Sequence, residues 1–206
     1  MFILYKMKPT NKLIKKLLGI LVLGLLLITP SQADDIRDFQ IEGISVGDSL
    51  LDFANEEKIN SIRSEDQYKN DKFIIYNADE LVENKNYDYM SATTKKNDNN
   101  YIVTSVSGII NYEELDDCLN RKNLIQNEIE KIFKYDDKDE VKYPSHRDKT
   151  GKSIIYGVQY YFKPYPSTEG ITINCFHFTP ETKIQRTLKV NVSSEEYSYF
   201  LINEAK

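Results

Sequence analysis

The chain contains only two cysteines, and each lies on the apolar face of a different predicted element. Cys118 belongs to a stripe of apolar residues that recurs at three- and four-residue steps, as in a long helix beginning near Asn111. The stripe consists of Leu115, Cys118, Leu119, Ile125, Ile129, Ile132 and Phe133. Cys175 follows Ile171 and Ile173 at two-residue steps, as on one face of a β-strand. Both sulfur atoms are therefore expected at an interface between a helix and a sheet.

Residues 1–33 are typical of a secretory signal peptide. They hold five lysines and no acidic residue, with an apolar run over Leu17–Ile28 and small residues at Ser31 and Ala33. A membrane span needs about 20 apolar residues, and this run has twelve, so cleavage after Ala33 is favoured over a retained anchor. We therefore expect a periplasmic or secreted protein, with residues 34–206 as a single domain and no stable membrane span after cleavage.

Export favours a disulfide between the two cysteines, because exported proteins meet an oxidising compartment. We predict a Cys118–Cys175 bond that fixes the long helix on the sheet. In the loop-entropy model, closing a loop of this length is worth about 4 kcal/mol. The alternative is two separate buried thiols, which would appear as two alkylatable groups in denatured, unreduced protein.

The remaining segments show the periods of strands and short helices. Alternating or β-rich runs predict strands at Phe73–Tyr76, Tyr87–Thr94, Tyr101–Ile110, Ile154–Phe162, Ile171–Cys175 and Leu188–Val192. The second and third of these form a hairpin, and the last three form a meander. The segment Tyr135–Lys152 is charged, has no apolar period and is predicted to be a long surface loop.

Short helices are expected near both ends of the domain. One covers Asp48–Ala54, capped by Ser45 or Asp48, and a second starts at an Asn55 cap. Two capping boxes are predicted, Asn111 with Glu114 for the long helix and Ser193 with Glu196 for a C-terminal helix that points Tyr197, Phe200 and Leu201 inward. The fold is therefore α+β: an antiparallel sheet, built from a hairpin and a three-strand meander, with the helices packed on one face.

The charge balance argues against a nucleic-acid partner. Without residues 1–33, 22 basic residues face 32 acidic ones, a net charge of −10. Such a chain repels phosphate backbones and anionic lipids, and no basic stripe counters that repulsion.

Few motifs suggest catalysis. The run Gly43-Ile44-Ser45-Val46-Gly47 matches the Gly-x-Ser-x-Gly elbow of serine hydrolases, but the chain is short for the large parallel sheet that the elbow requires. Two turn glycines are the simpler interpretation. The two histidines, His146 and His177, have no zinc-ligand spacing, and the acidic segment 136–140 lacks the calcium-loop pattern. No metal or cofactor is expected, and His177 is interpreted as a partly buried residue at a strand end.

Aromatic residues offer a candidate binding surface. It consists of Tyr156, Tyr160, Tyr161 and Tyr165, on and after one predicted strand, with His146 in the neighbouring loop. Tyrosine combines a rigid apolar body with a polar tip, which suits it to recognition. The alternative is that about half of these side chains face the core, as alternation in a strand implies.

The run Ile41–Leu51 resembles the mature N-terminus of small exported proteins from AT-rich marine alphaproteobacteria. The segment Ser105–Gly108 before a helix with Cys118, and a later strand with Cys175, fit the same pattern, so the resemblance covers most of the chain beyond residue 33; it implies no activity. At the level of fold, a Gly-x-Ser-x-Gly start before an antiparallel sheet is similar to β-lactamase-inhibitor-like periplasmic modules, which implies protein binding.

Together these observations predict a non-enzymatic periplasmic module that binds an envelope protein or a small ligand through the sheet face or the long loop. The alternative is a small periplasmic hydrolase that uses Ser45 or the loop around His146.

Overall fold

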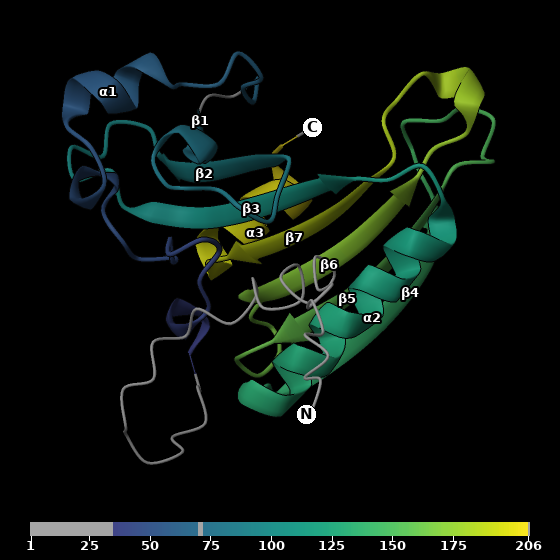
Figure 1. Ribbon diagram of the computed structural model, residues 1–206. Helices are drawn as coiled ribbons and strands as arrows, with labels where there is room; N and C mark the ends of the chain where they lie inside the picture. The colour runs from purple at the N-terminus through teal and green to yellow at the C-terminus, as the bar shows by residue number, and fades with distance from the viewer. Residues whose placement is uncertain (1–34, 70–71, 206) are drawn as a thin grey trace, which may run out of the picture. The chain divides into compact units, whose positions relative to one another are not determined.

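The structure is a computed structural model that describes residues 35–69 and 72–205, so the predicted signal peptide lies outside the described residues. The strands are β1 (Phe73–Asn77), β2 (Tyr89–Lys95), β3 (Val103–Asn111), β4 (Asp137–Pro144), β5 (Ile154–Tyr161), β6 (Gly170–His177) and β7 (Thr187–Ser193). Within the described residues they form one antiparallel sheet in the order β1-β2-β3-β7-β6-β5-β4 (Figure 1). Two meanders, β1–β3 and β4–β7, thus meet at the β3–β7 pair. The predicted α+β class is confirmed.

Three α-helices accompany the sheet in the described ranges: α1 (Glu56–Ser61), α2 (Leu115–Ile132) and α3 (Glu195–Asn203). Short 3-10 turns occur at Ile36–Asp38, Leu50–Asp52, Ala78–Glu80 and Pro180–Thr182. The Asn55 cap is confirmed, since its Oδ1 accepts from the Lys58 N–H at 2.9 Å.

The other predicted caps are wrong by one to four residues. Ser194 caps α3, because Ser193 is still paired in β7. Likewise Asn111 ends β3, so α2 begins after Glu114 and lacks a side-chain cap bond. Ser49 caps the 3-10 turn that replaces the predicted helix over 48–54.

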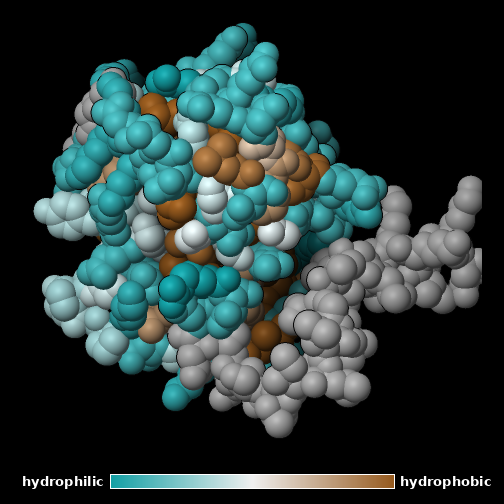
Figure 2. Space-filling model, turned by 90° about the vertical axis from the view of Figure 1, so that its left-hand side faces the viewer, coloured by the Kyte–Doolittle hydropathy of each residue, from teal (hydrophilic) through white to brown (hydrophobic). Residues whose placement is uncertain are grey.

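The side of the molecule that carries α1 is largely hydrophilic (Figure 2). Hydrophobic atoms show there only in patches between polar side chains. The apolar residues therefore have to be buried against the sheet, and most of them lie on one of its two faces.

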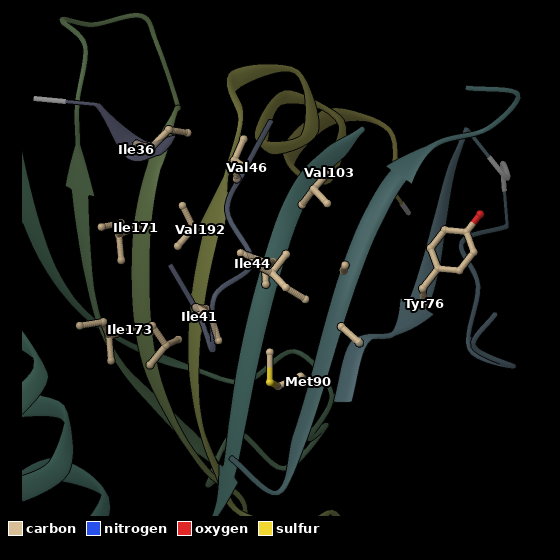
Figure 3. Close-up of a cluster of buried hydrophobic side chains, with 14 of the residues drawn as sticks. Ile36, Ile41, Ile44, Val46, Tyr76, Met90, Val103, Ile171, Ile173 and Val192 are labelled. Carbon is tan, nitrogen blue, oxygen red and sulfur yellow. The ribbon is translucent and has the colours of Figure 1, made fainter. Parts of the chain in front are cut away.

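This apolar face is covered by the N-terminal segment (Figure 3). Its strands contribute fully buried side chains that include Met90, Val106, Ile171, Ile173, Leu188, Val190 and Val192. Ile41 and Ile44 reach the same core because reciprocal backbone hydrogen bonds between them close a tight turn. Glu42 and Gly43 adopt φ values of 49° and 86° in this turn. The first glycine of the Gly-x-Ser-x-Gly run thus serves a left-handed backbone position.

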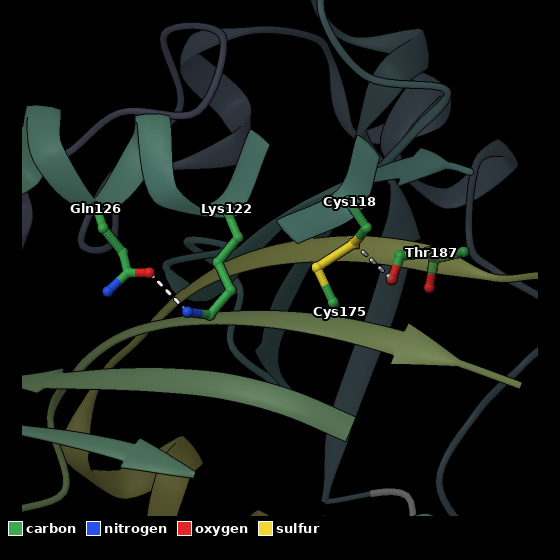
Figure 4. The surroundings of a disulfide bond; sticks show 5 residues. All are labelled: Cys118, Lys122, Gln126, Cys175 and Thr187. Atoms are coloured by element: carbon green, nitrogen blue, oxygen red, sulfur yellow. Dashed lines mark hydrogen bonds between the residues drawn. A yellow bond between two sulfur atoms is a disulfide. The ribbon is translucent and has the colours of Figure 1, made fainter. Parts of the chain in front are cut away.

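Helix α2 packs on β6 and β7 and is joined to β6 by the predicted Cys118–Cys175 disulfide, with 6.0 Å between the Cα atoms (Figure 4). The row that α2 buries is more polar than expected: after Cys118 come Lys122 and Gln126, whose side chains are joined by a 2.6 Å hydrogen bond. Burial lowers the pKa of Lys122. Ile132, predicted in the apolar stripe, is 38% exposed because α2 ends there and the next residue, Phe133, turns inward instead.

Helix α3 lies on the opposite face from α2, which corrects the expectation of helices on one face (Figure 1). Phe73 alternates in β1 with the core residues Ile74 and Tyr76, so it points to the other side, where it packs with Tyr197 and Phe200 of α3. The predicted inward positions of these two α3 residues are confirmed. Leu201 is 39% exposed, because it follows Phe200 around the helix.

The predicted loop over 135–152 is wrong in its first half, where β4 forms the edge of the sheet. The residues of this strand that alternate between the two faces of the sheet are mostly charged. Lys138 points toward α2 and forms a 3.0 Å ion pair with Glu130. Neighbouring Asp137 and Asp139 belong to the other face, next to Tyr161 and Gln159 of β5. A search for apolar alternation overlooks such a strand.

The rest of that segment is a turn organised by Asp148. Its carboxylate accepts hydrogen bonds from the N–H and Oγ of Ser153, at 2.9 and 2.6 Å, and from the N–H and Oγ1 of Thr150, at 2.9 and 2.7 Å. These bonds hold the pKa of Asp148 well below its usual range. The carboxylate thus stabilises the turn in its ionised form.

Asp148→Asn is expected to lower the melting temperature at neutral pH. Because the pKa of Asp148 is lower in the folded than in the unfolded chain, its contribution is present above about pH 4 and is lost as the pH falls toward the folded value. Thermal unfolding followed by circular dichroism at a series of acidic pH values should therefore show the difference between wild type and variant shrinking in acid. Asp66→Asn, at an exposed position, is the control. A constant difference at every pH would contradict this role for Asp148.

Candidate functional site

The predicted aromatic surface divides between the two faces of the sheet. Tyr160 is fully buried, and its hydroxyl donates to Glu130 of α2 at 2.9 Å. Burial raises the pKa of this hydroxyl. Tyr156 shares that face and lies under the Lys142 ammonium, 5.0 Å from the ring centroid. Tyr160 therefore belongs to the core and contributes no docking surface, because even-numbered residues of β5 face α2.

The other three predicted residues lie apart from this pair. Tyr161 is on the opposite face, with its hydroxyl 3.3 Å from Asp139. Tyr165 is 95% exposed in the segment between β5 and β6. His146 is exposed in the turn before β5, at the other end of a strand about 25 Å long. The structure does not bring the five residues into one site.

Among the described residues, Ser45 makes none of the contacts that the hydrolase hypothesis requires. Ser45 is 3% exposed, and its Oγ has no hydrogen-bond partner among the described residues, so no histidine is placed to take its proton. His177 is partly buried at the end of β6, as predicted, and burial lowers its pKa. Elsewhere in ranges 35–69 and 72–205, no cluster of three or more His, Cys, Asp and Glu side chains could hold a metal ion.

A different group of side chains gathers on the sheet face that α2 does not cover. It consists of Lys189 on β7, Thr172 and Asn174 on β6, and Gln159 on β5, and we call it the polar sheet patch. Lys189 is directly opposite Asn174, and Thr172 is directly opposite Gln159, in the strand registers. Because side chains two residues apart share a face, all four point to the same side. The patch thus spans three adjacent strands.

The four side chains of the polar sheet patch make no side-chain hydrogen bond or ion pair with the part of the chain that the structure describes. Each is partly buried. The neighbouring Asn191 shows the contrast: its Oδ1 accepts from Ser105 and Ser107, and its Nδ2 donates to Ser193, so three of the four hydrogen-bonding positions of its amide are used inside the protein. The patch begins where this internal network ends, and its side-chain donors and acceptors are left without a side-chain partner among the described residues.

Lys189 is the one charged member of the patch. Its cross-strand neighbours are uncharged, Ile109 on β3 and Asn174 on β6. Burial lowers the pKa of the Lys189 ammonium, and no carboxylate among the described residues offsets that effect. An unpaired ammonium in a partly desolvated place binds an anionic group more strongly than one in open water.

A buried glycine lies beneath the patch. Gly157 is directly opposite Asn174, and a Cβ at position 157 would lie 2.2 Å from the Asn174 Oδ1 and 2.9 Å from Val141 Cγ2. The Asn174 amide therefore lies across the glycine, where any other residue would displace it.

A separate hollow of about 690 Å³ lies between the β2–β3 turn and the start of α3. Its lining includes Lys95, Asp98, Glu196, Ile102 and Gly47. Lys95 and Glu196 pair with each other, and the Asp98 carboxylate accepts two backbone N–H groups. Since these charges are already satisfied within the protein, the hollow offers a ligand fewer free groups than the polar sheet patch.

Sequence reasoning missed the polar sheet patch, although a signal for it exists. Thr172 and Asn174 alternate with the apolar residues that defined β6, and Lys189 alternates with those that defined β7. The same period that predicts the core face thus places these polar residues together on the other face. What the sequence lacks is the strand order, which sets β5, β6 and β7 side by side.

Comparison of the chain with family models, with curated proteins and with solved structures finds no match. Along the described ranges, no helix combines the length and the hydrophobicity required to cross a membrane.

Proposed function

We propose that the protein is a non-enzymatic binding module whose polar sheet patch holds a polyhydroxylated ligand with a carboxylate group, such as an acidic saccharide. The observation that carries the proposal is the position of Lys189, which has no carboxylate partner in the described part of the chain and lies beside uncharged amide and hydroxyl side chains. Periplasmic or secreted localisation is part of the proposal, and the Cys118–Cys175 bond supports it because disulfides persist in oxidising compartments.

The chemistry of the patch selects the ligand class. A carboxylate can accept a charge-assisted hydrogen bond from Lys189, and such bonds are about twice as strong as neutral ones. The amides of Asn174 and Gln159 and the hydroxyl of Thr172 both donate and accept, as sugar hydroxyls do. Because the chain without residues 1–33 carries 32 acidic residues and 22 basic ones, a ligand with a single negative charge suits it better than a polyanion.

The proposal is tested by titrating ¹⁵N-labelled protein with sodium glucuronate and following amide chemical shifts, with glucose at matched ionic strength as the uncharged probe. Glucuronate is expected to shift amides of β5, β6 and β7, and glucose to shift them far less. Lys189→Gln should weaken glucuronate binding at least tenfold, because a hydrogen bond to a charged group is worth about 1.5–3 kcal/mol. Lys152→Gln removes the same charge at an exposed turn position and should leave binding unchanged.

A second variant tests the position of the amide. Gly157→Ala should displace the Asn174 side chain and weaken binding; because the added Cβ would also lie 2.9 Å from Val141 Cγ2, the exposed Val141 side chain has to shift as well. Saturable shifts that persist in Lys189→Gln, or shifts confined to other elements, would overturn the assignment of the site.

A further inference from the structure

Strand β4 leaves one edge of the sheet without a partner strand. It is eight residues long, and all of them are exposed except Lys138, which is partly buried. The opposite edge is protected: Ser64 N–H donates to Ile75 O, and Asn77 N–H donates to Ile62 O, both at 2.9 Å, so residues 62–64 cover β1. Among the described strands, β4 is therefore the place where a further strand can pair.

The outward backbone groups of β4 belong to its even-numbered residues. Ser145 N–H donates to Ser153 O at 2.8 Å, in continuation of the β4–β5 register. Hydrogen-bonded pairs alternate in an antiparallel ladder, so Tyr143, Val141 and Asp139 also direct their N–H groups to β5. Lys142, Glu140 and Lys138 then direct theirs outward. In agreement, the Lys138 N–H is bonded to a side chain, the Asp137 carboxylate, at 2.8 Å.

Charged side chains on an edge strand usually prevent pairing. On β4 the charges along one face alternate in sign, as Lys138, Glu140 and Lys142. The strand is therefore selective for a partner strand of complementary charge. Two copies that extend one continuous sheet in antiparallel fashion are related by a two-fold axis through one pair of residues, and only residues on the same face become opposite.

The possible registers differ sharply in charge. With the axis at Glu140, at Asp139 or at Lys142, that residue meets its own copy, and like charges directly opposite each other are destabilising. With the axis at Val141, Val141 meets Val141, and each Glu140 meets the Lys142 of the other copy. In the same register Asp139 meets Tyr143, which can donate a hydrogen bond to the carboxylate.

We infer that the protein forms a homodimer by antiparallel pairing of β4 with β4 of a second copy, in the register centred on Val141. The pairing continues one sheet across both copies and places the two polar sheet patches on the same continuous face. The inference does not depend on the proposed ligand, since it uses the backbone edge and side chains outside that patch.

Sedimentation equilibrium over a range of protein concentrations tests the dimer. Wild type should dimerise, whereas Glu140→Lys alone and Lys142→Glu alone should each dimerise about tenfold more weakly, because each sets like charges opposite each other twice. Mixing the two variants should restore association: one copy then carries lysine at both positions and the other carries glutamate at both, so each cross-strand pair is again of opposite charge. This rescue would also show that both variants are folded.

Glu140→Pro is the matched backbone variant. The N–H it removes points outward, so the β4–β5 ladder is kept while the ring blocks a partner strand. Its circular dichroism spectrum should match that of wild type, and it should be monomeric. A wild-type protein that stays monomeric at all concentrations, or a dimer unaffected by the charge and proline variants, would overturn the inference.

Discussion

Replacing Cys118 and Cys175 together by alanine is expected to lower the free energy of unfolding by about 4 kcal/mol, because the bond closes a loop in the unfolded chain. The two residues are separated by 57 positions, which makes the loop long. Both side chains are buried, so alanine leaves only a small space and no unpaired polar group. Urea denaturation followed by circular dichroism measures the difference.

The structure gives a reason for this helix to need a covalent link. The row of α2 residues facing the sheet continues from Cys118 to Lys122 and Gln126, whose polar side chains satisfy each other but contribute little hydrophobic burial (Figure 4). Apart from Cys118, the hydrophobic contacts with the core in the first three turns of α2 come from Leu119 and Ile125, which are only partly buried. We therefore expect hydrogen exchange to quicken in α2 before it does in β6 and β7.

Reduction provides the matched control. Wild type unfolded in the presence of dithiothreitol should lose about as much stability as the double variant, and the double variant should not respond to the reductant. The Cα atoms of the two cysteines lie 6.0 Å apart. Equal stability of wild type with and without reductant would contradict the expected contribution of the bond.

The disulfide was predictable because two independent periods pointed to it. The three- and four-residue steps around Cys118 and the two-residue steps around Cys175 each describe burial, and burial against one interface brings the sulfurs together. The same argument identified the strands with apolar alternation. It failed at β4, where the alternating residues are charged, and a charged period does not reveal whether the strand is paired.

The capping boxes failed for a related reason. Ser193 and Ser194 both satisfy the N-cap preference, and only the pairing of β7 with β3 and β6 decides that the strand ends at Ser193. Local propensity thus located the helix, while tertiary hydrogen bonds fixed its boundary.

The candidate site depended still more on strand order. Lys189, Asn174 and Gln159 are far apart in the sequence, and each is an ordinary outward-facing residue of its own strand. They form one patch only because β7, β6 and β5 are neighbours. The aromatic cluster around Tyr160 attracted attention by composition, yet alternation divides it between a buried and an open face.

Phe200→Ala is expected to destabilise the protein by about 3 kcal/mol, at the lower end of the range for phenylalanine truncation in a core, because the cluster around it is small. Phe200 is fully buried, and its ring centroid lies 4.8 Å from that of Phe73 and 5.0 Å from that of Tyr68. It is thus the main apolar contact that holds α3 on the sheet. Tyr199→Ala, at a position 57% exposed on the same helix, should change stability by no more than about 0.5 kcal/mol.

The loss in Phe200→Ala should be local to one face of the sheet. Hydrogen exchange is expected to quicken in α3, while α2 on the other face, fixed by its disulfide, keeps its protection. Asn191 is linked to α3 through Ser193, whose Oγ hydrogen-bonds Ser198 Oγ at 2.9 Å. Because its Oδ1 also accepts from Ser105 and Ser107 of β3, we expect the end of the internal network beside Lys189 to stay in place. The variant should then bind glucuronate as wild type does, despite its lower stability. Equal loss of protection in α2 and α3 would mean that the two faces unfold as one unit. The geometry of the polar sheet patch would then depend on the whole sheet and not only on β5, β6 and β7.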